Sequence, residues 1–234
     1  MDIKAIIFDK DGTLIDFAET YNPATRIVLD QLCGRDDALL QKAANVWGFD
    51  LETGKIKDDS VIVAGSGVDL AEAIASLIEI EDNVAFGAKL DEMFGNVCVD
   101  TVSALPETQT ALKKLQSNGI LLGIGTNDSE ANAVSQMQRL EFETFFHKIL
   151  GSDSGYGAKP GPGMVTGFVE HCGLAPEQVM MVGDSLHDLE AGKAAGVVTC
   201  GVETGPADRS ALEKHADIVL PSIAGLPGYL GMLV

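Results

Sequence analysis

A short apolar segment near the N-terminus ends on two carboxylates, and this combination restricts the possible folds more than any other feature of the chain. Residues 3–8 are typical of a buried strand, because the segment is almost continuously apolar. Asp9 and Asp11 follow on either side of one residue, and Gly12 then permits a tight turn. Open α/β sheets bind ligands at the carboxyl ends of their strands, where two acids suit Mg²⁺ and a phosphate that shares it. The alternative is an ordinary acidic turn.

Beyond residue 100 the chain alternates between short apolar segments and amphipathic ones. Strands are predicted at residues 120–125, 147–150, 179–182, 197–201 and 218–220. Helices are predicted between them at 106–117, 129–139, 162–172, 186–195 and 207–214, with Ser129 as an N-cap and Gly173 as a C-cap. This alternation predicts a Rossmann-like, doubly wound parallel sheet with helices on both faces, an α/β fold.

The region between the first strand and residue 100 has a different character. Helical segments are predicted at 18–32, 36–47, 60–80 and 83–97, with a bend or a helix start at Gly65-Ser66-Gly67. No segment has the pattern of a buried strand. We therefore predict two domains: a catalytic core made of residues 1–16 and 100–234, and a helical insert made of residues 17–99. The single tryptophan, Trp47, is more typical of packing inside this insert than of a ligand contact.

The charge balance excludes some classes of partner. The chain has 16 Lys and Arg residues against 35 Asp and Glu, a formal net charge of −19. Binding to nucleic acid or to an anionic membrane depends on clustered basic residues, so neither is expected. No apolar stretch reaches the roughly 20 residues of a membrane helix, and no signal peptide is recognisable. The four widely spaced cysteines are expected to be free thiols. Free thiols, without a recognisable signal peptide or membrane helix, predict a cytoplasmic protein.

Complementary polar groups follow four of the predicted strands. Beyond the two acids of the first strand, these groups are Thr126-Asn127, Lys159, and Asp184 with Asp188. The carboxyl ends of parallel strands lie along one edge of a sheet, so we expect the groups to meet there. Each has a commoner explanation by itself, namely a helix N-cap for Thr126-Asn127 and Asp184-Ser185, and a surface position for Lys159. Together they supply acids for a metal, and a hydroxyl, an amide and an ammonium for phosphate oxygens.

With these motifs the sequence resembles the phosphatases of the haloacid dehalogenase superfamily. The first motif of that superfamily is similar to Phe8-Asp9-Lys10-Asp11-Gly12-Thr13-Leu14, and the second to Thr126-Asn127. The third is similar to Lys159-Pro160, and the fourth to the segment that begins with Gly183-Asp184-Ser185 and includes Asp188. The resemblance is greatest to the branch of phosphoglycolate phosphatase and β-phosphoglucomutase. That branch carries a helical cap domain between the first two motifs, where residues 17–99 stand here.

The resemblance implies a role for each of these residues. Asp9 would be the nucleophile that forms an aspartyl-phosphate, and Asp11 the general acid and base. Catalysis would also use Thr126 and Lys159, and the substrate would be bound by Thr126, Asn127 and Lys159. The cofactor Mg²⁺ would be bound by Asp9, the backbone carbonyl of Asp11, Asp184 and, directly or through another residue, Asp188.

The function implied is hydrolysis of a small phosphorylated metabolite, of the phosphoglycolate or sugar-phosphate type, by a Mg²⁺-dependent phosphatase. The alternative from another enzyme class is a phosphomutase, in which the phosphoryl group returns to a sugar; a third is a binding module without turnover. Asp128 stands where a Lys or Arg is common in phosphoglycolate phosphatases, and we expect its charge to repel a second anionic group of a substrate. The oligomeric state is expected to be a monomer or a homodimer.

Overall fold

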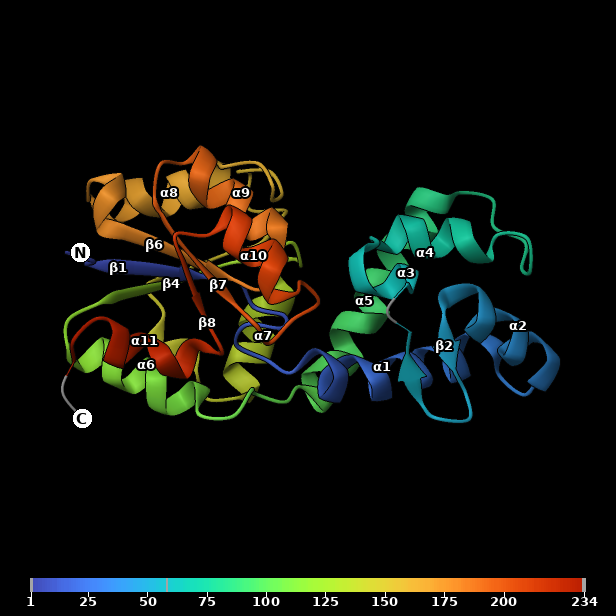
Figure 1. Cartoon of the computed structure of the whole chain (residues 1–234). Coiled ribbons are helices and arrows are strands. Elements are labelled where there is room, and N and C mark those ends of the chain that lie inside the picture. Colours follow the sequence, from blue (N-terminus) through green and yellow to red (C-terminus); the bar gives the residue numbers. More distant parts are fainter. Residues whose placement is uncertain (1, 58, 233–234) are drawn as a thin grey trace. The chain divides into compact units, whose positions relative to one another are not determined.

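The computed structural model describes residues 2–57 and 59–232, which form two compact units. The core unit comprises Met1–Asp16 and Ser103–Val234, and the cap unit comprises Phe17–Val102 (Figure 1). The chain leaves the core unit after Asp16 and returns three residues later than the sequence pattern places it. The reason is that helix α5 (Asn83–Thr101) continues beyond residue 97 before the chain turns back.

In the described part of the core unit, one parallel sheet has the strand order β5-β4-β1-β6-β7-β8. The strands are β1 (Ala5–Phe8), β4 (Leu121–Gly125), β5 (Lys148–Leu150), β6 (Val179–Gly183), β7 (Val198–Val202) and β8 (Ile218–Leu220). Phe8 at the end of β1 pairs in register with Ile124 on β4 and with Val182 on β6. The residues that follow β1 therefore lie beside the ends of β4 and β6, which confirms the predicted α/β fold.

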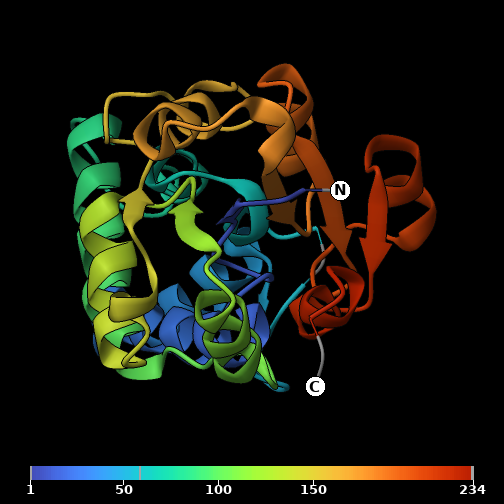
Figure 2. The ribbon, with the colours of Figure 1, turned by 90° about the vertical axis from the view of Figure 1, so that its left-hand side faces the viewer.

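Helices cover both faces of this sheet. They are α6 (Thr108–Ser117), α7 (Glu130–Arg139), α8 (Gly163–Cys172), α9 (Leu186–Ala194), α10 (Arg209–His215) and α11 (Leu226–Tyr229), with short 3₁₀ turns at Glu143–Phe145, Pro176–Gln178 and Ile223–Gly225. Helices α8 and α9 lie on one face, and α6 and α11 on the other (Figures 1 and 2). Buried apolar residues of β1 and β6 alternate between the faces, and Ile7 and Met181 pack with Phe168 of α8.

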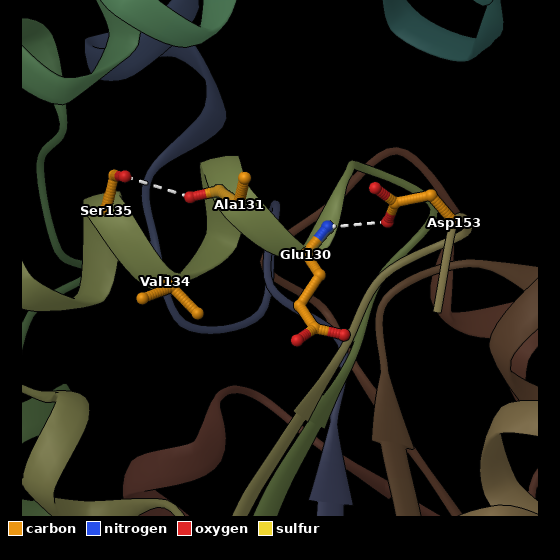
Figure 3. A pocket seen from close by; sticks show the side chains of 5 residues that line it. All are labelled: Glu130, Ala131, Val134, Ser135 and Asp153. Atoms are coloured by element: carbon orange, nitrogen blue, oxygen red, sulfur yellow. Dashed lines mark hydrogen bonds between the residues drawn. The ribbon is translucent and has the colours of Figure 1, made fainter. Parts of the chain in front are cut away.

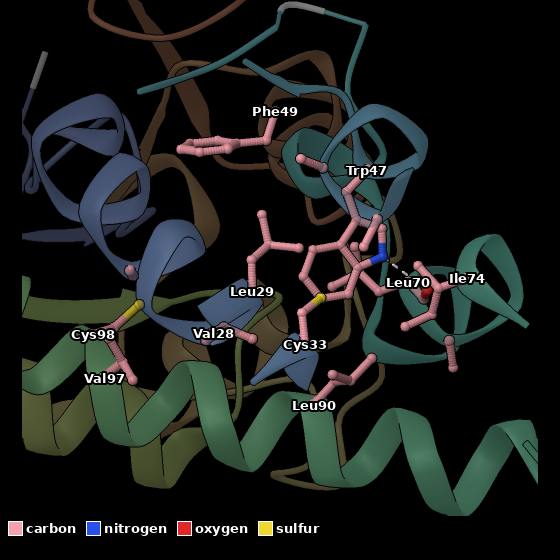
Figure 4. Close-up of a cluster of buried hydrophobic side chains, with 14 residues drawn as sticks. Val28, Leu29, Cys33, Trp47, Phe49, Leu70, Ile74, Leu90, Val97 and Cys98 are labelled. Atoms are coloured by element: carbon pink, nitrogen blue, oxygen red, sulfur yellow. Dashed lines mark hydrogen bonds between the residues drawn. The ribbon is translucent and has the colours of Figure 1, made fainter. Parts of the chain in front are cut away.

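The cap unit is mainly helical and has an apolar core of its own. Its helices are α1 (Phe17–Cys33), α2 (Asp37–Trp47), α3 (Val61–Ala64), α4 (Gly67–Ile74) and α5. Trp47 is fully buried in a cluster with Leu29, Leu70 and Leu90, and its Nε1 donates a hydrogen bond to the carbonyl of Leu70 at 3.0 Å (Figure 4). The interpretation of Trp47 as a packing residue is confirmed.

The bend or helix start expected at Gly65-Ser66-Gly67 is confirmed: the segment is divided at Gly65 into α3 and α4, because Ser66 caps α4 through a reciprocal pair with Asp69. The helical segment expected over residues 60–80 is too long, since α4 ends at Ile74. The region also contains an antiparallel hairpin of β2 (Phe49–Asp50) and β3 (Lys55–Ile56). Two-residue strands carry too little periodicity to be recognised in a sequence.

No described helix has the length and apolar character needed to span a membrane. All four cysteines are free, as expected, and three of them are buried.

Candidate active site

Four charged side chains that follow three separate strands meet at the carboxyl edge of the sheet. Asp9 directly follows β1, and its amide donates to the carbonyl of Val182 on the neighbouring strand β6 at 2.8 Å. Asp184 directly follows β6, and Asp188 lies one turn into α9. Lys159 comes from the long loop between β5 and α8. Parallel pairing of the strands thus brings together residues far apart in the sequence, such as Asp9 and Lys159, which are 150 positions apart.

Lys159 is the cation of this cluster. Its Nζ lies 2.5 Å from Oδ1 of Asp9 and 2.6 Å from Oδ1 of Asp188, and all three residues are buried. Burial alone would lower the pKa of Lys159, but the carboxylates of Asp188 and Asp9 raise it above its ordinary value. The ammonium therefore stays charged and offsets part of the negative charge of the proposed nucleophile.

The carboxylates outnumber the cation, and this excess of negative charge is what a metal site requires. Oxygen atoms of Asp9, Asp184 and Asp188 lie within 4.8 Å of one another, and among the described residues Lys159 is the one ammonium paired with the group. Burial raises the pKa of Asp9 to about 7 against the opposing effect of Lys159, and burial with the charges of Asp9 and Asp188 raises the pKa of Asp184. Three carboxylate donors fit a hard divalent cation such as Mg²⁺.

The backbone is shaped around Asp184. Oδ1 of Asp184 accepts a hydrogen bond from the hydroxyl of Thr13 at 2.6 Å. Its other oxygen lies so close to Gly12 and Gly205 that a Cβ would stand 2.5 Å away at Gly12 and 1.6 Å away at Gly205. Gly12 was expected only to form a turn, and Gly205 was not recognised, because a glycine after a strand ordinarily indicates a turn. Both residues leave room for this carboxylate.

Asp188 is both a helix cap and a member of the charged cluster. Its Oδ2 accepts hydrogen bonds from the amide and the hydroxyl of Ser185 at 3.0 and 2.7 Å, at the start of α9. Its Oδ1 contacts Lys159. One side chain therefore takes part both in the cap of α9 and in the charged cluster.

Thr126 and Asn127 follow β4 and have different surroundings. Thr126 is buried, and its hydroxyl accepts from the amide of Asp128 at 3.1 Å, which leaves its own proton to donate. The Asn127 side chain forms a reciprocal pair with the backbone of Lys159: Nδ2 donates to the carbonyl at 3.0 Å, and Oδ1 accepts from the amide at 2.8 Å. Asn127 thus fixes the loop that carries Lys159.

A second buried lysine, which the sequence interpretation passed over, lies between the two acids of the first motif. Lys10 is fully buried, and its Nζ lies 2.9 and 2.8 Å from the two carboxylate oxygens of Asp11. It also donates to Oε1 of Gln136 at 2.6 Å and lies 3.1 Å from Oδ2 of Asp128. The carboxylate of Asp11 is therefore turned to Lys10 and stands outside the group of three potential ligands.

This contact offsets part of the charge of Asp128, which was expected to repel a second anionic group of a substrate. Its Oδ2 is paired with Lys10, and its Oδ1 accepts from the amide of Ser129 at 2.7 Å and from Nδ2 of Asn132 at 2.9 Å. Both carboxylate oxygens of Asp128 are thus used inside the core unit. A lysine placed between two acids in the sequence was the signal that could have indicated such a pairing.

A hollow of about 490 Å³ on the surface of the core unit is lined by other residues (Figure 3). The lining comprises Glu130, Ala131, Val134 and Ser135 of α7 together with Asp153, whose Oδ1 accepts from the amide of Glu130 at 2.8 Å. Within the described part of the chain neither Glu130 nor Asp153 forms an ion pair, so their carboxylates would repel a phosphate there. None of the motif residues lines this hollow.

Comparison with known proteins gives a consistent result. The chain is 26% identical over 245 residues to the phosphoglycolate phosphatase of Escherichia coli (strain K12), covering 99% of this chain and 94% of the relative. A predicted phosphoglycolate phosphatase from Haemophilus somnus 129pt has a similar structure, with a TM-score of 0.74, 20% identity, and coverage of 98% of this chain and 99% of that one. A candidate β-phosphoglucomutase from Thermotoga maritima gives a TM-score of 0.70 at 23% identity, with coverage of 99% and 100%.

Most of the chain matches a single family model. The family model described as haloacid dehalogenase-like hydrolase matches residues 3–196, which include all four motifs and the cap unit. The match extends over most of the chain, and the fold and the order of the motif residues along the sheet agree with it. The chain belongs to the haloacid dehalogenase-like hydrolase family.

Proposed function

We propose that this hydrolase is a Mg²⁺-dependent phosphatase that cleaves a small phosphorylated metabolite through an aspartyl-phosphate on Asp9. The observation that carries the proposal is the contact of 2.5 Å between Lys159 and Asp9 at the end of β1. A carboxylate and a phosphate dianion repel each other, so the nucleophile needs a fixed cation beside it. The ammonium of Lys159 supplies that charge in direct contact with Oδ1 of Asp9.

In the first step, an oxygen of Asp9 attacks phosphorus while the bond from phosphorus to the leaving oxygen breaks. Asp11 gives its proton to that oxygen, so the product leaves as an alcohol. In the second step, a water molecule attacks the phosphorus of the aspartyl-phosphate, Asp11 takes a proton from the water, and the bond to Asp9 breaks. Inorganic phosphate is released, and both acids return to their starting states.

The phosphoryl oxygens are held by donors at the ends of β4 and β5. The hydroxyl of Thr126 and the ammonium of Lys159 are placed to do so, and Asn127 contributes by fixing the backbone of Lys159. Donors that are already fixed in a buried site stabilise the charge of the transition state without having to reorganise.

Asp9, Asp184 and the backbone carbonyl of Asp11 would hold Mg²⁺, with Asp188 beside them. The fit rests on the three clustered carboxylates and on the space that Gly12 and Gly205 leave around Asp184. When bound, the ion supplies positive charge that offsets the acids and the phosphate. Without a cation, burial favours the protonated form of Asp9, which is a weaker nucleophile.

We propose a phosphomonoester of a small metabolite as the substrate, with phosphoglycolate as the first compound to test. The relative in Escherichia coli bears the name phosphoglycolate phosphatase. The pairing of Asp128 with Lys10 weakens the earlier reason to disfavour a substrate with a second anionic group, since Lys10 offsets part of the charge of Asp128. The four free cysteines agree with the reducing cytoplasmic location that we propose for the protein.

The test is phosphate release from a panel of phosphomonoesters, with Mg²⁺ or with EDTA, by the wild type, Asp9→Asn and Asp153→Asn. Asp153 is an exposed carboxylate of the same unit and lines the hollow on α7, so it is the matched control. We expect release by the wild type and by Asp153→Asn only with Mg²⁺, and none by Asp9→Asn. Equal activity of Asp9→Asn and the wild type would refute the assignment of the nucleophile.

The two alternatives are separated by the same assay. A mutase would isomerise a sugar phosphate and release little phosphate. Because the fold is similar to that of a candidate β-phosphoglucomutase, the panel must include sugar phosphates, and their isomerisation must be measured. A binding module would turn over no ester at all, including p-nitrophenyl phosphate. Either outcome would replace the phosphatase proposal.

A further inference from the structure

The buried Lys10 has no role in the proposed reaction, yet it contacts the proposed general acid directly. Its Nζ lies within 2.9 Å of both oxygens of the Asp11 carboxylate, and the Lys10 side chain is fully buried while that of Asp11 is 23% exposed. One side of Asp11 is therefore held by a fixed cation, and another side stays open. A carboxylate accepts on both oxygens in about four directions, so contact with Lys10 leaves Asp11 able to contact a substrate.

Helix α7 and the turn before it hold Lys10 in place. Oε1 of Gln136 accepts from Nζ at 2.6 Å, and Oδ2 of Asp128 lies 3.1 Å away. Asp128 is itself fixed, because Ser129 and Asn132 donate to its other oxygen. Gln136 is 1% exposed, so this side of the lysine is closed to water. The lysine is thus bound on one side by α7 and on the other by Asp11.

We propose that Lys10, anchored by Asp128 and Gln136, is a positioning residue that holds the Asp11 carboxyl group in the orientation needed for proton transfer. The inference rests on the proposed function, since it requires Asp11 to act as the acid. A general acid works only within hydrogen-bond reach of the leaving oxygen. A partly exposed aspartate would otherwise rotate about two bonds, and a displacement of about 1 Å can reduce a rate by roughly 100-fold.

This role makes a particular prediction about leaving groups. An alkoxide is a poor leaving group and needs a proton from Asp11, whereas 2,4-dinitrophenolate leaves without one. The ratio kcat/KM covers the steps up to departure of the leaving group, so it does not depend on hydrolysis of the aspartyl-phosphate. Loss of the orientation of Asp11 should therefore reduce kcat/KM for an alkyl phosphate and spare 2,4-dinitrophenyl phosphate.

The experiment measures kcat/KM with Mg²⁺ for β-glycerol phosphate and for 2,4-dinitrophenyl phosphate. The first variant is the double change Lys10→Met and Asp128→Asn, which removes the ammonium together with one of the two carboxylates that pair with it. The second is Gln136→Met, which keeps every charge and removes only the acceptor from α7. The control is Thr199→Val, because Thr199 is also a fully buried residue of this unit whose hydroxyl donates to a carboxylate, Asp217, at 2.9 Å, away from Asp11.

We expect kcat/KM for the alkyl ester to fall by roughly 10- to 100-fold in the double variant and by less in Gln136→Met. The dinitrophenyl ester should change by less than about 3-fold in both, and Thr199→Val should not change the ratio between the esters. In an Asp11→Asn background, Gln136→Met should add no further loss for the alkyl ester, because the group that it orients is gone.

Equal losses for both esters, or a further loss in the Asp11→Asn background, would show a merely structural role and overturn the inference. No change for either ester would overturn it as well. If the double variant does not fold, Gln136→Met and its Asp11→Asn combination decide the question by the same criteria. Absence of turnover by the wild type would be a different failure, since it would refute the proposed function itself and not only the role of Lys10.

Discussion

The core unit and the cap unit differ in what they bury. Within the described residues, every buried charged side chain belongs to the core unit, namely Asp9, Lys10, Lys159, Asp184 and Asp188. The buried polar residues of the cap unit are the neutral Thr20, Thr25 and Ser60, and its centre is the apolar cluster around Trp47. Ser60 donates to the carbonyl of Trp47, so even this polar group serves the packing.

The difference shows that burial stabilises one unit and costs the other unit stability. Apolar burial stabilises the cap unit by the removal of surface from water, and this contribution does not depend on metal and changes little with pH. Buried acids in excess of cations destabilise the core unit by themselves, since each charge loses its hydration. Such an arrangement is retained where the charges perform chemistry. The comparison can be tested by perturbing each unit separately.

The largest effect is expected for Lys159→Met. The variant removes the cation beside Asp9, so we expect phosphate release to fall by roughly 1000-fold, as for loss of a fixed donor in other active sites. The measurement is kcat/KM with Mg²⁺, and the control is the exposed Lys113→Met on α6. A loss of less than 10-fold would show that the charge of Lys159 is not needed for attack.

The apolar cluster of the cap unit is tested by Trp47→Ala. Removal of a fully buried tryptophan should destabilise the cap unit by about 3–5 kcal/mol. Hydrogen exchange followed by mass spectrometry should show lost protection in the peptides of α1, α4 and α5, with the peptides of β1 and β6 unchanged. Equal loss of protection in both units would mean that they unfold together and would break the comparison.

The charged cluster of the core unit is tested by pH. The pKa of Asp9 is raised from 3.8 to about 7, so between these values the folded protein without metal keeps a proton that the unfolded chain releases. The free energy of unfolding in EDTA should therefore fall as the pH rises from 4 to 7, by up to about 4 kcal/mol from this group. The raised pKa of Asp184 acts in the same direction.

Urea unfolding at pH 4, 5.5 and 7 measures this change, with and without Mg²⁺. The ion binds ionised carboxylates, so its stabilising effect should be greatest at pH 7 and small at pH 4. The variant Asp184→Asn should reduce both the pH dependence and the effect of Mg²⁺. A free energy of unfolding in EDTA that rises between pH 4 and 7 would contradict the raised pKa of Asp9.

The smallest effect is expected for the space around Asp184. Gly205→Ala would place a Cβ 1.6 Å from an oxygen of Asp184, and the required shift should destabilise the protein by about 1–3 kcal/mol and weaken Mg²⁺ binding. Gly228→Ala is the matched control, since its Cβ would meet nothing within 4 Å. Thermal unfolding and titration with Mg²⁺ measure both effects, and equal behaviour of the two variants would refute the role of Gly205.

Much of the core unit could be predicted because its signals are local. Each strand is a short apolar segment, and four of them, β1, β4, β5 and β6, precede the polar residues that the resemblance assigned to the site. The cap unit was predicted less well. Its hairpin has only two residues in each strand, and α4 ends at Ile74 although the apolar spacing of its segment continues to Leu77 and Ile78. Short elements depend on their tertiary surroundings more than on their own sequence.

The sequence by itself determined the order of strands and helices, the fold class and the acids that follow β1 and β6, because these depend on neighbouring residues. Only the tertiary structure decided which charges pair. Lys10 contacts Gln136 at a separation of 126 residues, and Lys159 contacts Asp9 at a separation of 150. The energy of such a contact depends on the distance between the charges in space and on their exclusion from water. Neither quantity is contained in the spacing of residues along the chain.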